Sequence, residues 1–167
     1  NKLIISLKKL GIPNVRFKVL FEESEPTKNG FDKITFMFSA NPGLPLEPLG
    51  ETASGGEKSR VLLAIKAIFS AVDQTNLLIF DEIDSGVSGS VSSHVANLLS
   101  ELSNHRQVFC VTHQPLIAAF ADNHFALKKT VIAGHTKSDV INLREISDRQ
   151  RELAALAGGE IVEANAY

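Results

Sequence analysis

The stretch LLIFDEIDSGVSG, residues 77–89, places three carboxylates directly after an apolar run. Residues 77–80 are continuously apolar, which predicts a strand covered on both faces in a parallel sheet. In open α/β sheets, ligands bind at the carboxyl ends of the strands, where Asp81 and Glu82 fall. A strand-end aspartate can hold Mg²⁺ directly or through water, and its neighbour can orient or deprotonate an attacking water. A charged pair that only caps a turn on a solvated rim would give the same local sequence.

The segments around this stretch alternate between helix and strand. Ser54 with Glu57 fits a capping box at a helix start. One apolar face is predicted for that helix from Val61, Leu62, Ile65, Ile68, Phe69 and Val72. A second amphipathic helix is predicted from Val91, Val95, Leu98, Leu99 and Leu102, and QVFCVT, residues 107–112, predicts a second buried strand. The order strand, helix, strand predicts a right-handed crossover and an α/β fold with a parallel sheet.

The two ends of the chain have other patterns. Residues 2–10 predict a helix that Gly11 and Pro13 stop, and residues 15–23 and 31–40 predict an antiparallel hairpin around the turn EPTKNG. The proline-rich segment 41–50 predicts an extended loop. After residue 112 we expect a short helix at 115–121, strands at 125–129 and 139–146 with a hairpin tip between them, and a last helix at 148–157 that ends at Gly158 and Gly159.

Composition limits what the chain can be. With 167 residues, 44% of them hydrophobic, the chain can bury a core, and we expect one domain over residues 1–167. A net charge of -2 gives no overall attraction to nucleic acid or to an anionic membrane. No apolar run approaches the roughly 20 residues of a membrane span. The single Cys110 cannot form an internal disulfide, which indicates a reduced, cytoplasmic protein. The chain begins with Asn1 inside an expected helix, so we expect a fragment or a processed chain.

Two further segments carry candidate site residues. His113 follows the second predicted strand, so it should emerge on the same sheet edge as Asp81, where an imidazole can bond a phosphate oxygen. In ETASGGEKSR, residues 51–60, Gly55 and Gly56 leave backbone N–H groups uncovered at the positive end of a helix, which attracts phosphate. An ordinary cap would explain Ser54 and Glu57, but it would leave the glycine pair unexplained.

These three motifs in this order resemble the C-terminal half of an ABC-type ATPase head. The combination of SANPG, ASGGEKSR, FDEIDSGVSG, CVTHQP and ELAALAGG is similar to bacterial DNA-repair members of the SMC-like branch, over about residues 10–160. The resemblance implies a parallel sheet with flanking helices plus an N-terminal antiparallel hairpin. It also implies that residues 1–10 are the end of a returning coiled-coil arm.

The resemblance implies a role for each candidate residue in a dimer that sandwiches ATP. The signature motif, Ser54, Gly55, Gly56 and Glu57, would face the γ-phosphate of ATP bound by the other subunit. Asp81 would support Mg²⁺, Glu82 would position the hydrolytic water, and His113 would touch the γ-phosphate, while Asp84 would shape the turn. Residues 83–89 would cross the interface, where many relatives carry an aspartate in place of Ser88. Lys58 stands where relatives often have an apolar residue.

The sequence contains no Gly-rich phosphate loop with its Lys-Ser/Thr pair, and without one ATP is held too weakly to react. We therefore expect the chain alone to be inactive and to need an N-terminal head half and a second head as partners. The resemblance alone implies that the whole protein binds DNA and is located at the bacterial nucleoid. The sequence itself shows no DNA-binding surface, because its lysines are scattered: Lys8, Lys9, Lys128, Lys129 and Lys137.

Two other functions fit the residues. One is a stand-alone metal-dependent phosphohydrolase that uses Asp81, Glu82, Asp84 and His113, and that would bind Mg²⁺ without a nucleotide. The other is a non-catalytic dimerisation module, in which replacing Glu82 would change nothing.

Overall fold

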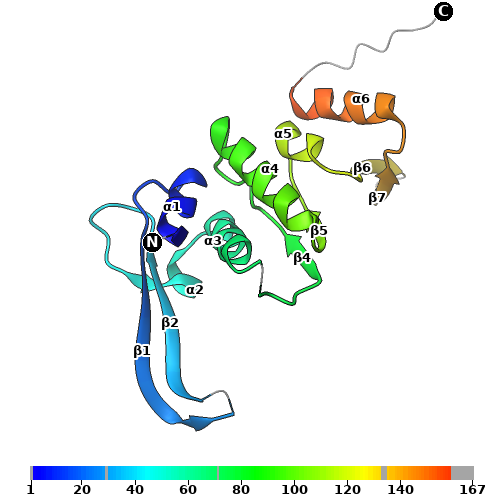
Figure 1. Ribbon diagram of the computed structural model, residues 1–167. Helices are drawn as coiled ribbons and strands as arrows, with labels where there is room; N and C mark the ends of the chain where they lie inside the picture. The colour runs from blue at the N-terminus through cyan, green and yellow to red at the C-terminus, as the bar shows by residue number, and fades with distance from the viewer. Residues whose placement is uncertain (1, 29, 71, 133–134, 159–167) are drawn as a thin grey trace, which may run out of the picture. The chain divides into compact units, whose positions relative to one another are not determined.

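The computed structural model describes residues 2–28, 30–70, 72–132 and 135–158 (Figure 1). The chain divides into two compact units, residues 1–111 and residues 112–167. One domain over the whole chain therefore stays a prediction. In the part of the chain that the structure describes, no helix is long and apolar enough to cross a membrane.

The N-terminal helix and hairpin follow the prediction. Helix α1 (Lys2–Lys9) ends at Gly11, which has a φ of 82°, and strands β1 (Arg16–Thr27) and β2 (Gly30–Ser39) pair antiparallel. Both strands extend into the segment predicted as a turn. Pro26 is accommodated because β1 is an edge strand and its register shifts between Glu23 and Thr27, which releases the proline from the ladder.

The proline-rich segment is more regular than an extended loop. Strand β3 (Glu47–Pro48) pairs with β2, and helix α2 (Leu49–Thr52) follows at once. Pro48 is the N-cap of α2, and a proline at a helix start loses no hydrogen bond. This segment connects the hairpin to the next helix.

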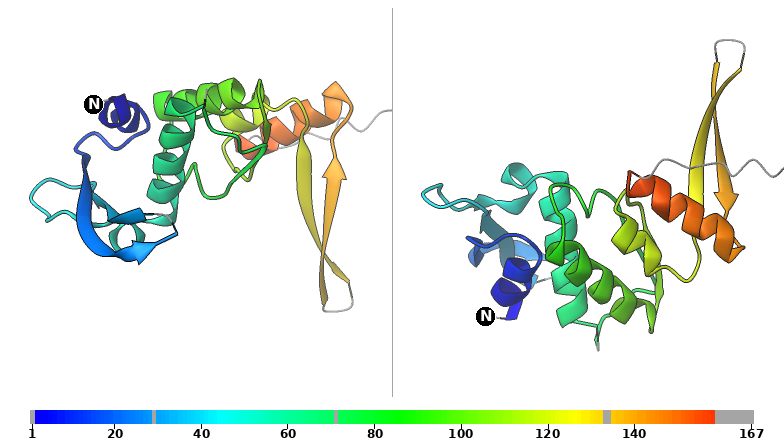
Figure 2. Two further views of the ribbon diagram at one scale, coloured as in Figure 1. Left: turned by 60° about the horizontal axis from the view of Figure 1, so that its bottom comes forward. Right: turned by 90° about the horizontal axis from the view of Figure 1, so that it is seen from above.

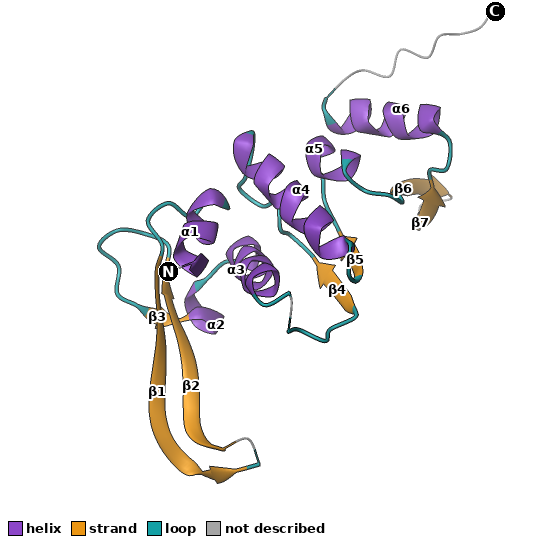
Figure 3. Ribbon diagram, in the orientation of Figure 1, coloured by secondary structure: helices purple, strands orange, loops and turns teal. Residues whose placement is uncertain are grey.

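Helix α3 (Gly55–Ile68) begins as predicted, but its buried face matches the predicted one only in part, at Val61. Its buried residues are Gly56, Arg60, Val61, Leu63 and Ala64. Of the predicted apolar face, Leu62, Ile68, Phe69 and Val72 are exposed. Helices α1 and α4 both pack against α3 (Figure 3), so neighbouring elements determine which side of α3 is covered.

The predicted strand, helix, strand unit is present. Strand β4 (Leu77–Phe80) and strand β5 (Gln107–Cys110) pair in parallel, and helix α4 (Ser90–Ser103) connects them. The prediction that both strands are covered on both faces is wrong within the described chain. Leu78 and Phe80 are buried, whereas Ile79 is 64% exposed and Phe109 is 46% exposed.

The core of the first unit contains side chains from α1, β2, α3, β4 and α4 and from the segments beside them. Its largest fully buried apolar side chains are Leu7, Leu10, Phe38, Val61, Leu63, Phe80, Ile83, Val95 and Leu102. Burying such side chains contributes about 1.5–3 kcal/mol each. Ile83 belongs to the loop after β4, so that loop is anchored in the core.

The second unit contains a short helix, a hairpin and the last helix. Helix α5 (Pro115–Ala119) precedes β6 (Phe125–Ile132) and β7 (His135–Asn142), which form a long two-stranded ribbon (Figure 2). Both strands extend further toward the tip than predicted. The second strand was predicted to run to residue 146, but β7 ends at Asn142 and helix α6 (Ile146–Leu156) begins at the residue where the predicted strand ends. Gly158 follows α6 as predicted, and Gly159 lies outside the described residues.

An ion-pair cluster ties the C-terminal end of α3 to the start of β5. The Asp73 carboxylate accepts bonds from Lys66 Nζ at 2.8 Å and Arg106 Nη1 at 3.1 Å, and from the Thr75 hydroxyl at 2.7 Å. Arg106 Nη2 also donates to the Ser70 carbonyl at 3.0 Å. The hydrogen bonds from Lys66 and Thr75 hold the pKa of Asp73 well below its ordinary value.

This low pKa predicts a pH-dependent stability. An unfolded aspartate titrates near pH 3.9, so the contribution of Asp73 is complete above about pH 4 and is lost as the pH falls further. Urea unfolding at several pH values should show that Asp73→Asn lowers stability at pH 7 and that the difference from the parent shrinks below about pH 4. Asp148→Asn breaks an exposed pair with Arg151 and removes one negative charge from the first turn of α6, so it should change stability less at pH 7. A constant difference down to about pH 2 would contradict the assignment.

Candidate functional site

The start of α3 is a complete capping box. The Ser54 hydroxyl oxygen accepts from the Glu57 N–H at 3.3 Å, and Glu57 Oε2 accepts from the Ser54 N–H and hydroxyl, each at 2.9 Å. The side chains of Ser54 and Glu57 therefore have a structural role at this helix end. The first backbone N–H groups of α3 carry its positive dipole end, and Ser54 and Gly55 are exposed there.

The carboxylates after β4 differ in exposure. Asp81 and Glu82 are exposed, whereas Asp84 is 2% exposed and lies in the following turn, where its carbonyl accepts from Val87 N–H. Asp81 Oδ1 accepts from the Glu82 N–H at 2.9 Å. Glu82 has a φ of 56° and is the one non-glycine residue of the described chain in the left-handed region. Such a backbone costs free energy and persists only where the surroundings hold it.

The structure brings the start of α3 and the loop after β4 together. A Cβ on Gly55 would lie 2.1 Å from Glu82 Oε2, and a Cβ on Gly56 would lie 3.0 Å from the Glu82 carbonyl oxygen and 2.9 Å from Ser85 Cβ. The glycine pair that an ordinary cap leaves unexplained is thus explained by close packing. The Glu82 carboxylate lies directly against the first turn of α3.

The ends of β4 and β5 are negatively charged. Burial, together with the charges of Asp84 and Asp81, raises the pKa of the Cys110 thiol to about 12. Cys110 therefore stays a neutral thiol and is unsuited to nucleophilic or redox chemistry at neutral pH. The same negative charge attracts a cation to this edge of the strands.

The donor set limits how a metal would be held. Among the described residues, no group of three or more His, Cys, Asp or Glu side chains could hold a metal ion. The exposed Asp81 carboxylate fits a Mg²⁺ ion whose other ligands are water and phosphate oxygens, which is how nucleotide sites hold Mg²⁺. It does not fit a cage built from protein alone. The buried Asp84 also fits poorly as a ligand of a stand-alone hydrolase.

Two other candidates are His113, in the second unit, and Ser88, at the start of α4. His113 is exposed between β5 and α5 and belongs to the second unit, so its approach to Asp81 stays a prediction. Ser88 is exposed, and its carbonyl accepts from Val91 N–H at the start of α4. The structure therefore joins six candidates, Ser54, Gly55, Gly56, Glu57, Asp81 and Glu82.

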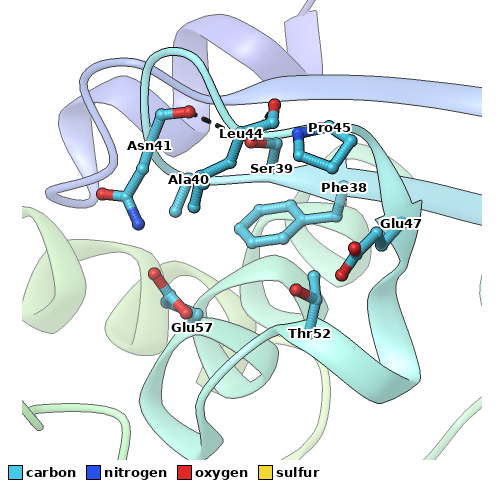
Figure 4. A pocket seen from close by; sticks show the side chains of 9 residues that line it. All are labelled: Phe38, Ser39, Ala40, Asn41, Leu44, Pro45, Glu47, Thr52 and Glu57. Carbon is cyan, nitrogen blue, oxygen red and sulfur yellow. Dashed lines mark hydrogen bonds between the residues drawn. The ribbon is translucent and has the colours of Figure 1, made fainter.

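Glu57 also lines a pocket of about 240 Å³ (Figure 4). Besides Glu57, it is lined by Phe38, Ser39, Ala40, Asn41, Leu44, Pro45, Glu47 and Thr52. The Ser39 hydroxyl donates to the Asn41 carbonyl at 3.1 Å and so holds the turn at its rim. Asp81 and Glu82 do not line this pocket, so it is separate from the carboxylate edge.

Sequence reasoning missed two residues of the junction. The Ser59 hydroxyl donates to the Asp81 carbonyl at 2.7 Å, and the buried Arg60 donates from Nη1 to the Ser85 carbonyl at 2.8 Å. The sequence held no signal for either residue, because α3 carries other charged side chains at Glu57, Lys58 and Lys66.

A comparison with family models decides the family. The model described as "AAA domain, putative AbiEii toxin, Type IV TA system" matches residues 14–119, which is more than half of the chain. The chain belongs to the AAA domain family. The matched region of this AAA domain includes both the start of α3 and the carboxylates after β4.

Curated relatives of this AAA domain chain are DNA repair proteins. It is 44% identical to "DNA repair protein RecN" of Synechocystis sp., over 95% of this chain and 30% of the relative. It is 42% identical to RecN of Treponema pallidum, over 89% of this chain and 28% of the relative. It is 39% identical to RecN of Deinococcus radiodurans, over 98% of this chain and 29% of the relative. The chain thus spans about 30% of the length of the curated relatives that it matches.

Solved structures confirm the predicted fold. The Smc head domain with a coiled coil and joint from Pyrococcus yayanosii matches 93% of this chain with a TM-score of 0.63 and 22% identity, and the chain covers 28% of it. The Smc head domain from Pyrococcus furiosus matches 91% of this chain with a TM-score of 0.57 and 22% identity, and the chain covers 36% of it. The AAA domain chain has the α/β fold of an SMC-like ATPase head, and its similarity to RecN is also confirmed.

Proposed function

We propose that this chain is part of the ATP-hydrolysing head of a RecN-like protein of DNA double-strand-break repair. The observation that carries the proposal is the junction of the SGGE helix start with the strand-end carboxylates. Glu82 lies against Gly55, in a chain that is similar to RecN over 95% of its length. Residues 1–167 would form one lobe of the head, and α1 would be the end of a coiled-coil arm.

The proposed roles divide between the two ends of the junction. The backbone N–H groups of Gly55 and Gly56 and the Ser54 hydroxyl would bind the γ-phosphate of a nucleotide held by a second head, since a helix N-terminus attracts phosphate. Glu57 would hold Ser54 in place through the capping box. Ser88 would lie in the segment that crosses the dimer interface.

The carboxylate edge would act on the nucleotide of the same head. Mg²⁺ would supply charge neutralisation of the phosphates there, with Asp81 as its protein ligand. Glu82 would orient the attacking water and accept its proton, because its carboxylate is exposed at the end of β4. His113 would hydrogen-bond the γ-phosphate. The negative potential at Asp81 disfavours a bare phosphate, so nucleotide is expected to bind here with its cation.

Apolar side chains on one side of β4 and β5 support the need for another segment. The exposed ones are Leu77, Ile79, Phe109 and Val111. We propose that the N-terminal head half, which carries the phosphate loop, covers them, because burying apolar area drives such association. We call this chain together with that half the assembled head. The whole protein would act on DNA in the bacterial cytoplasm, at the nucleoid, without a membrane.

Reconstitution tests the proposal. The 167-residue chain alone should release no phosphate from ATP above the background, since nothing in its sequence cradles the β-phosphate. The assembled head, obtained by co-expression with the N-terminal half of a RecN relative, should hydrolyse ATP. Phosphate release is measured for both at equal concentration. Robust, Glu82-dependent turnover by the chain alone would contradict the need for a second half and favour a stand-alone hydrolase.

A further inference from the structure

Two successive side chains of α3, Ser59 and Arg60, donate hydrogen bonds to every second backbone carbonyl in residues 81–85, at the end of β4 and in the loop after it. The Ser59 hydroxyl donates to the Asp81 carbonyl at 2.7 Å, and Arg60 Nη1 donates to the Ser85 carbonyl at 2.8 Å. The same Nη1 lies 3.4 Å from the Ile83 carbonyl oxygen in a weaker bond. Glu82, with its left-handed backbone, is the residue between the Asp81 and Ile83 carbonyls in the chain. The loop on both sides of Glu82 is therefore fastened to α3.

Arg60 is an unusual residue for a packing position. It is 6% exposed, and its Nε is buried without a hydrogen-bond partner among the described residues. Burial lowers the pKa of the Arg60 guanidinium, and the charge of Glu57 partly offsets this. Burying a charge is costly, and an unbranched apolar side chain of similar length could fill the same space without that cost. Packing alone therefore does not explain an arginine here.

We infer that Ser59 and Arg60 are positioning residues, which hold Glu82 in its left-handed backbone and fix its carboxylate against the start of α3. This inference rests on the proposed function, because the residue that Ser59 and Arg60 position, Glu82, has its role only in that function. A left-handed non-glycine backbone needs surrounding structure to maintain it, and the carbonyls before and after Glu82 are the groups that α3 holds.

The arrangement also joins two nucleotide sites through one helix. In the proposed dimer, Ser54 to Gly56 face the nucleotide of the other head, while Glu82 acts on the nucleotide of its own. Gly56 allows the loop to lie against α3, since a Cβ there would meet the Glu82 carbonyl at 3.0 Å and Arg60 Nη1 at 3.2 Å. Hence a shift of the first turn of α3 would move the Glu82 carboxylate with it.

Arg60→Met in the assembled head tests the inference. Methionine keeps the length and removes both the charge and the donors, so the loop loses its hold while the space stays filled. We expect kcat for ATP hydrolysis to fall about 10- to 100-fold, because small misplacements of a catalytic group have effects of this size. We expect KM for ATP to change less than about threefold, since phosphate binding does not use the arginine.

Arg106→Met is the matched control. Arg106 is the other buried arginine with an unbonded Nε among the described residues, and it holds a backbone carbonyl at Ser70, away from the loop after β4. Its replacement should lower the urea midpoint and leave kcat within about twofold at a temperature where the protein stays folded. An equal kcat loss in both variants would show that destabilisation alone is responsible and would overturn the inference.

A double-mutant cycle separates this inference from the proposed function. If Arg60 acts through Glu82, then Arg60→Met should cause no further loss of turnover in a Glu82→Gln background. If Glu82→Gln itself leaves turnover unchanged, the proposed function fails. If Glu82→Gln abolishes turnover but Arg60→Met leaves kcat at the parent value, only the positioning role fails.

Ser59→Ala covers the case in which Arg60→Met does not fold. This variant removes a single hydroxyl from a half-buried position and should leave the urea midpoint nearly unchanged. The inference is supported if Ser59→Ala lowers kcat in the parent protein but causes no further decrease in the Glu82→Gln background. It is overturned if Ser59→Ala leaves kcat of the parent protein unchanged.

Discussion

Replacing Glu82 by glutamine in the assembled head is expected to lower the rate of ATP hydrolysis by roughly 10²- to 10⁴-fold, the usual contribution of a general base. Glutamine has the same shape and keeps the packing against Gly55, but its amide cannot accept a proton from water. ATP binding should persist, because the groups proposed to hold the phosphates are untouched. Phosphate release gives the rate, and equilibrium binding of a fluorescent ATP analogue gives the affinity.

Glu101→Gln is the matched control for this experiment. Glu101 is an exposed carboxylate near the end of α4, outside the proposed site, so its replacement should leave the rate within about twofold. Unchanged turnover in the Glu82→Gln variant would reject the catalytic assignment and favour a non-catalytic dimerisation module. Lost ATP binding would instead show that Glu82 holds the nucleotide or its cation.

Replacing Gly56 by alanine is expected to lower the free energy of unfolding by about 1–3 kcal/mol, the usual cost of overpacking. The added Cβ would meet the backbone oxygen of Glu82 at 3.0 Å and Ser85 Cβ at 2.9 Å. Backbone atoms cannot rotate away, so the loop after β4 must move away from α3. Urea unfolding of the 167-residue chain, followed by circular dichroism, measures the change.

Gly55→Ala provides the comparison within the same turn. Its Cβ would meet only the end of the Glu82 side chain, which can rotate away, so stability should stay within about 1 kcal/mol of the parent, since alanine is also the better helix former. Turnover by the assembled head should nevertheless fall, because the Glu82 carboxylate is displaced. Equal stability losses at Gly55 and Gly56 would contradict the close approach of the loop backbone to Gly56.

Local sequence signals predicted the elements that depend on local chemistry. The capping box at Ser54 and Glu57, the stop at Gly11 and the strand, helix, strand unit around α4 are all present. Exposure was harder to predict, because it depends on what lies against each face. Its apolar neighbours predict that Ile79 is buried, yet in this chain the side chains on one face of β4 are exposed to solvent. Periodicity describes an element and not its surroundings.

The candidate site shows the same division. Motif order pointed to the start of α3 and to Asp81 and Glu82, and the structure places those segments against each other. The hold of Ser59 and Arg60 on the loop carbonyls could not be predicted, since side-chain to backbone bonds between distant segments leave no pattern in the sequence. The left-handed backbone of Glu82 was hidden for a similar reason, because glutamate carries no preference for it.

That backbone also bears on how the protein evolved. At the position of Glu82, glycine would adopt a φ of 56° without steric cost, whereas glutamate gives up about 1 kcal/mol or more of stability to do so. Selection for stability alone would favour glycine at this position. With the catalytic role proposed for Glu82, a carboxylate at this position would be a trade-off of stability for activity, as functional sites commonly make.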